Sequence, residues 1–253
     1  MERLIELIFN GLPVESGLLM AGMSLASSFI TASMGIGGGV LLLAVMASLF
    51  PPLALIPVHG VIQLGSNFFR AVLMLAHVQW RVVAAFAAGS VLGVVIGGSV
   101  AVQLEPAVVQ IGIGAFVLWS VFRTPPAWLA KAGGLTGLAS SFLTMFFGAT
   151  GPFVANYVKS LTLPRQAHVS THAVLMTIQH SLKSLTFGFL GFAFGPWAGF
   201  ILLMIAMGFL GTVLGKRVLM RLDDRKFSRA LNLALLLISA RLIWLGASTL
   251  LAG

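Results

Sequence analysis

The sequence predicts an all-α polytopic membrane protein with about eight long transmembrane helices, two short or broken helices and two inverted structural repeats. Of the 253 residues, 58% are hydrophobic and only 8% are charged, and the mean hydropathy is +1.04. Soluble domains carry about 25% charged residues, so this composition cannot cover a surface that faces water. Apolar runs of roughly 20 residues recur along the chain, which is typical of transmembrane helices.

An internal repeat is the second observation behind this fold class. Residues 35–70 align with residues 148–183 at an offset of 113 without a gap, and seven of the 36 positions are identical. The matches include glycines, a proline and a histidine, and a cation closes both copies: Gly35/Gly148, Gly38/Gly151, Pro51/Pro164, His59/His172 and Arg70/Lys183. Duplication in so apolar a chain indicates a transporter built from repeats.

The first half is expected to contain six elements. They are a short amphipathic interfacial turn at 1–9, a span at 16–33, a short segment at 40–50, and spans at 54–76, 82–102 and 105–123. Residues 1–9 mix acids with apolar side chains, as helices at a membrane surface do. The Pro51-Pro52 pair ends the short segment. Within 82–102, Gly89, Gly93, Gly97 and Gly98 would allow close helix contact.

The second half repeats this plan after a linker at residues 123–131. This linker divides the chain into an N-terminal transmembrane repeat, 1–124, and a C-terminal transmembrane repeat, 125–253. The second half is expected to have spans at 128–147, 167–189, 197–219 and 230–251, and a short segment at 152–163. The basic loop Lys216–Arg229 separates the last two spans.

The positions of the cations indicate whether the short segments cross the membrane. If both segments re-enter, Arg81 and Arg123 lie on one side and Lys159 and Arg165 on the other. If both cross, all these cations share one side, which satisfies the positive-inside rule far better. Each half then crosses an odd number of times, so the halves are inverted relative to each other. This topology puts the basic loops in the cytoplasm and both termini outside.

Charge also restricts the function. All six acids lie at the ends of the chain or in loops, so the ionisable groups inside the spans are cations and histidines. Intramembrane ionisable residues usually face the interior of a helix bundle and serve function. Cations without acidic partners favour an anionic substrate. The net charge of +9 follows from the positive-inside pattern, so we expect no nucleic-acid partner. The chain has no cysteine and no hydrolase motif, and we expect no enzyme activity, cofactor or metal.

Two polar stripes and two glycine clusters define the candidate site. Within 59–70 and within 172–183, polar residues recur at helical spacing on one face. The glycines precede the short segments, where unpaired backbone N–H groups at helix N-termini can bind an anion. The predicted substrate-binding residues are Gly37, Gly38, Gly39, His59, Gln63, Asn67, Arg70, Thr150, Gly151, His172, Gln179, His180 and Lys183. Alternatively, the polar residues only tie helices together and the glycines only allow close packing.

These motifs resemble the TauE/SafE family of sulfite and organosulfonate exporters, which includes the toluene-sulfonate uptake permeases. The resemblance rests on GIGGG at residues 35–39, on HG..Q..SN..R at 59–70, and on their counterparts in the second half. It implies a multi-pass carrier in a prokaryotic inner membrane that exports sulfite or a related small sulfur anion by alternating access. Uptake of an organosulfonate or other organic anion, and a non-transporting scaffold, stay open as alternatives, as does a homodimer.

The two copies are not identical in the polar stripe. Gln63 aligns with Met176, and Asn67 aligns with His180. The second half therefore carries an additional titrating group, which bears on how transport is coupled.

Overall fold

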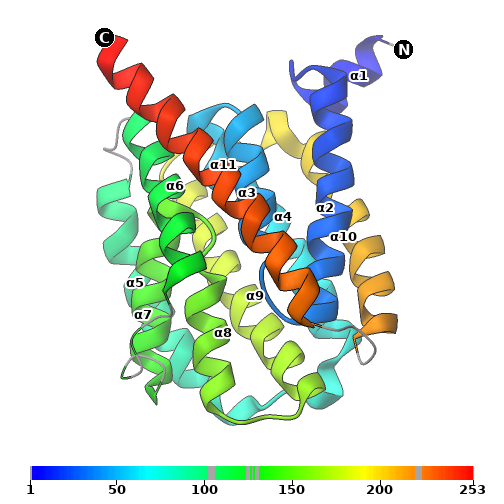
Figure 1. Ribbon diagram of the computed structural model, residues 1–253, viewed down its shortest axis with the longest axis vertical. Coiled ribbons are helices and arrows are strands. Elements are labelled where there is room, and N and C mark those ends of the chain that lie inside the picture. The colour runs from blue at the N-terminus through cyan, green and yellow to red at the C-terminus, as the bar shows by residue number, and fades with distance from the viewer. Residues whose placement is uncertain are drawn as a thin grey trace.

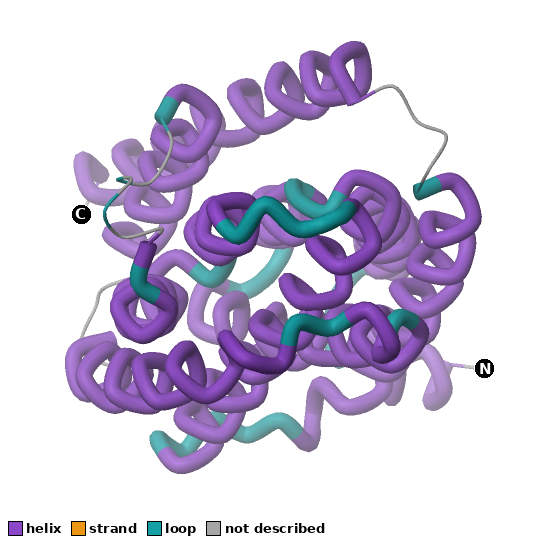
Figure 2. The backbone as a smooth tube through the Cα atoms, turned by 90° about the horizontal axis from the view of Figure 1, so that it is seen from below, coloured by secondary structure: helices purple, strands orange, loops and turns teal. Residues whose placement is uncertain are grey.

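The computed structural model describes residues 2–101, 106–123, 126, 128, 131–219 and 224–252. Every regular element in these ranges is a helix, and short loops join them (Figures 1 and 2). The helices of the first half are α1 (Glu2–Phe9), α2 (Val14–Met34), α3 (Gly38–Leu49), α4 (Pro52–Leu73), α5 (Val83–Ala101) and α6 (Pro106–Phe122). Those of the second half are α7 (Gly133–Phe147), α8 (Gly151–Ser160), α9 (Arg165–Phe189), α10 (Ala198–Val218) and α11 (Asp224–Ala252). The all-α prediction is confirmed.

Among the residues that the structure describes, three helical segments are long and apolar enough to cross a membrane: Val14–Met34, Trp80–Val100 and Gly195–Val218. Helices α4 and α9 have 22 and 25 residues, but they carry the polar stripes, which lowers their hydropathy. Shorter apolar helices accompany them, among them α3 and α7. The structure thus agrees with a multi-pass membrane protein.

Some element boundaries differ from the predicted ones. Helix α7 begins at Gly133 rather than at residue 128, because Ala132 is extended, with φ −126° and ψ 103°. Helix α11 begins earlier than expected, at Asp224. The predicted boundary between residues 124 and 125, Glu105, and residues 220–223 of the basic loop lie outside the described residues.

Glycines bring helices of the two halves into close contact. Helix α5 packs against α7, and α2 packs against α10. A Cβ atom at Gly93 of α5 would lie 2.9 Å from the Phe142 amide nitrogen of α7, and one at Gly211 of α10 would lie 3.0 Å from that of Phe29 in α2. Such distances exclude a side chain, so the prediction that the α5 glycines allow close contact is confirmed. The two halves therefore interleave.

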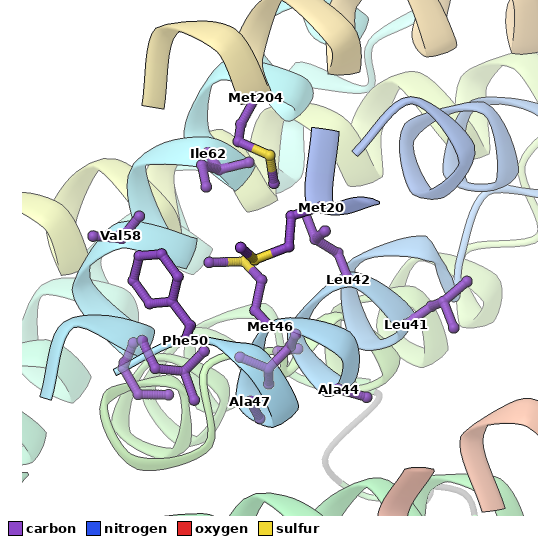
Figure 3. Packing of buried hydrophobic residues seen from close by; sticks show 14 of the residues in the cluster. Met20, Leu41, Leu42, Ala44, Met46, Ala47, Phe50, Val58, Ile62 and Met204 are labelled. Carbon is purple, nitrogen blue, oxygen red and sulfur yellow. The ribbon is translucent and has the colours of Figure 1, made fainter. Parts of the chain in front are cut away.

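The short helices lie in opposite parts of the molecule. In Figure 1, α3 occupies the upper half and α8 the lower half, while both termini lie at the top. The apolar core surrounds α3, where Leu42 and Met46 pack with Met20 of α2, Ile62 of α4 and Met204 of α10 (Figure 3). This core fixes α3 and leaves its N-terminal end beside α4 and α9.

Candidate functional site

A cavity lies where both helix breaks meet the polar stripes of α4 and α9. It encloses about 360 Å³ of space free of protein atoms, including its mouth. Its lining comes from both halves of the chain: Thr31, Ile36, Gly37, Gly39, Val40, His59, Gln63, Asn67, Ala149, Gly151, Pro152, His172, Met176 and His180. Eight of the thirteen predicted site residues are among these.

The break before α3 exposes amide groups to this cavity. Gly37 precedes the helix with φ +103°, a conformation that side chains rarely adopt, and Gly35 ends α2 with φ +90°. The first N–H groups of a helix have no partner within it. Gly39 and Val40, in the first turn of α3, line the cavity. This end of α3 is suited to an anion, because its amides and the helix dipole favour negative charge.

The break before α8 offers fewer donors. Gly148 ends α7 with φ +75°. Pro152 has no N–H group, and the Phe153 N–H donates to the Thr150 carbonyl at 3.0 Å. In the first turn of α8, Gly151 is left to supply an amide to the cavity. The two N-termini are therefore unequal, and α3 provides the richer set of donors.

The repeated histidines hold the first turns of the short helices. His59 Nε2 lies 3.1 Å from the Gly39 carbonyl oxygen, and His172 Nε2 lies 3.4 Å from that of Gly151. A carbonyl oxygen only accepts, so these two contacts are hydrogen bonds in the tautomer that carries the ring proton on Nε2. The two halves thus use the same contact. His180 completes the cluster, with its ring centre 6.3 Å from that of His59 and edge-on to it.

The two predicted cations are buried next to the cavity without lining it. Arg70 is 1% exposed and Lys183 0%. Arg70 Nη2 donates to the Asn67 side-chain oxygen, and its Nε and Nη1 atoms have no partner among the described residues. Lys183 Nζ donates to the Gly148 carbonyl at 3.1 Å, next to Ala149 in the cavity wall. Arg70 therefore contacts a lining residue, Asn67, and Lys183 contacts Gly148, the neighbour of the lining residue Ala149.

Three other predicted residues serve the packing of the helix breaks. Gln179 Nε2 donates to Thr150 Oγ1 at 2.8 Å, and Ser140 Oγ donates to Gln179 Oε1 at 2.6 Å. This network ties the start of α8 to α7 and α9. Gly38 packs against α2, where an added Cβ would lie 2.6 Å from the Ser27 carbonyl carbon. None of Gly38, Thr150 and Gln179 lines the cavity.

Several lining residues were not predicted from the sequence, among them Thr31 and Met176. A signal for Thr31 was present, because the repeat extends upstream at the same offset: residues 25–31 read LASSFIT and residues 138–144 read LASSFLT. Both copies precede a glycine with positive φ, whose N–H donates to the threonine carbonyl four residues earlier. Arg241, in the middle of α11, is exposed and does not line the cavity.

The Gln179 network predicts a measurable change in stability. Gln179→Met would remove two buried hydrogen bonds, from Ser140 Oγ to Gln179 Oε1 and from Gln179 Nε2 to Thr150 Oγ1, and leave Ser140 with its 3.0 Å contact to Thr150 Oγ1, a loss of about 1–3 kcal/mol. We expect a lower thermal unfolding midpoint in detergent than for wild type. Gln166→Met on the exposed side of α9 is the matched control. Equal midpoints for the two variants would show that the network does not hold α8.

Comparison with known proteins identifies a family. The family model described as sulfite exporter TauE/SafE matches residues 19–242, which include both helix breaks and both polar stripes. Comparisons with curated proteins and with solved structures gave no match. The matched region covers most of the chain, so this protein belongs to the TauE/SafE family of sulfite exporters, whose members are membrane transporters of sulfur anions.

Proposed function

We propose that this protein is a secondary transporter that exports sulfite or a related small sulfur anion, with the cavity as its binding site. The observation that carries this proposal is the site's polarity. The cavity combines the N-terminus of α3 with three histidines, and Arg70 and Lys183 are buried behind it. Buried charges are expensive unless they are paired, so an anion is the natural partner for these cations.

The proposed substrate-binding residues contribute in different ways. Gly37, Gly39 and Gly151 present backbone amides, and Gln63 and Asn67 present side-chain amides. His59, His172 and His180 complete the wall, and Arg70 and Lys183 supply positive potential from behind. Gly38, Thr150 and Gln179 hold the helix breaks in place.

Alternating access would move two inverted repeats, 1–124 and 125–253, around this site. Three features support the inverted arrangement. The short helices lie in opposite parts of the molecule (Figure 1), α4 packs against its repeat counterpart α9, and the α2–α10 contact mirrors the α5–α7 contact. Under this arrangement the basic loops face the cytoplasm of a prokaryotic cell and the protein sits in its inner membrane.

The test is transport of labelled sulfite by purified protein in proteoliposomes, with protein-free liposomes as the blank. Asn67→Asp is the informative variant, because Asn67 lines the cavity and accepts from Arg70. A carboxylate of the same shape would pair with Arg70 and compete with the substrate. We expect saturable transport by wild type and loss of at least about 90% in Asn67→Asp, a tenfold change that corresponds to about 1.4 kcal/mol.

Asn10→Asp, in the loop after α1, is the matched control and should transport like wild type. Saturable transport inward only, under every imposed gradient, would favour an uptake permease. Sulfite flux equal to that of protein-free liposomes would refute the proposal and favour a scaffold.

A further inference from the structure

The site has two cationic side chains, Arg70 and Lys183, and no acidic side chain. The sequence has no Asp or Glu between Glu15 and Glu105, or between Glu105 and Asp223. The helices α3, α4, α8 and α9 around the cavity therefore contain no acid, and α2 contains only Glu15 in its first turn. Arg70 and Lys183 are the two cations buried beside the cavity. Within the described residues, nothing in the protein neutralises them.

The histidines of the cavity add no charge to that of Arg70 and Lys183. His59, His172 and His180 each have a buried Nδ1 atom without a partner among the described residues. A second proton on any of these rings would add a buried charge beside Arg70 and Lys183, which is strongly unfavourable. The histidines therefore add nothing to the charge that Arg70 and Lys183 bring to the site.

The two cations are presented to the cavity from different helices. Arg70 is linked through Asn67, three residues away on α4. Lys183 is linked through the Gly148 carbonyl at the break before α8, and its side chain packs on α4, with Cε 2.7 Å from a Cβ position at Gly60. Positive potential therefore reaches the cavity from a helix of each half, α4 and α9.

We infer that the transported species is a dianion. This inference rests on the proposed function and specifies the charge of its substrate. The desolvation penalty is several kcal/mol for each buried ion, and only a doubly charged substrate offsets both. A singly charged sulfonate or hydrogensulfite leaves one cation uncompensated. The site therefore selects SO₃²⁻ over HSO₃⁻, and favours other small dianions over monoanions of the same size.

The experiment measures competition and pH dependence with wild-type protein in proteoliposomes. Thiosulfate, a dianion, and methanesulfonate, a monoanion of similar size, compete against labelled sulfite. We expect methanesulfonate to be weaker by about tenfold or more. We also expect the KM in total sulfite to rise by roughly tenfold for each pH unit below the second pKa of sulfite, where the dianion becomes scarce.

Thiosulfate provides the control for titration of the protein, because it stays doubly charged between about pH 6 and pH 8, the range in which histidine titrates. Titration of His59, His172, His180 or Lys183 would affect thiosulfate and sulfite alike, so only the additional pH dependence of sulfite is assigned to the loss of its dianion. Equal inhibition by methanesulfonate and thiosulfate, or a sulfite KM that follows hydrogensulfite, would overturn the dianion inference while leaving sulfite transport established. Absence of saturable sulfite transport at any pH would refute the proposed function itself.

Discussion

Lys183→Met is expected to reduce the kcat/KM for sulfite transport by roughly 100-fold or more while the protein stays folded. Removing one partner of a buried ionic interaction costs about 3–5 kcal/mol, and each 1.4 kcal/mol is tenfold. Lys183 is 0% exposed, and its Nζ donates a hydrogen bond to the Gly148 carbonyl. Methionine is an unbranched, flexible side chain that fills most of the same space beside Gly60. The measurement is initial sulfite flux in proteoliposomes at matched protein content.

Lys159→Met is the control for this variant, because Lys159 is an exposed cation at the end of α8. It changes the net charge by the same amount without touching the cavity. A wild-type flux in Lys183→Met would show that the buried cation takes no part in binding the anion. Thermal unfolding in detergent, measured on both variants, separates a loss of binding from a loss of folding.

Gly38→Ala is expected to abolish transport through the packing of α3 on α2. The added methyl group would collide with the Ser27 carbonyl and with Thr31 Oγ1, and the carbonyl belongs to the α2 backbone, which cannot move aside alone. Overpacking of this kind costs about 1–3 kcal/mol and sometimes more. The first turn of α3 would be pushed away from α2, and with it the cavity-lining Gly37 and Gly39.

Gly22→Ala is the matched control, because Gly22 lies on α2 and an added Cβ there meets nothing within 4 Å. Alanine is favoured over glycine inside a helix by about 1 kcal/mol, so this variant should be as stable as wild type or more stable. We expect Gly38→Ala to unfold at a lower temperature than Gly22→Ala and to lose sulfite flux. Full flux in Gly38→Ala would mean that α3 tolerates displacement and that its position is not critical.

The helices could be predicted because apolar runs and proline pairs determine where they begin and end. The cavity could be anticipated because the repeat aligns His59 with His172 and gives each copy a glycine-rich helix break before its histidine. The roles of the individual residues within the polar stripes could not be predicted, since they depend on neighbours from other helices. Gln63 and Gln179 share the stripe pattern, yet Gln63 faces the cavity and Gln179 meets Ser140 of α7. Such a partner 39 residues away leaves no local signal.

The absence of acids around Arg70 and Lys183 has a consequence for the response to voltage. An empty carrier with two buried cations is positively charged, whereas the complex with a dianion is neutral. A membrane potential then acts on the return of the empty carrier, and each charge that crosses the full potential contributes about 2.3 kcal/mol per 100 mV. With the cell interior negative, the field draws the empty site back inward. The resting potential would therefore drive export without a second ion.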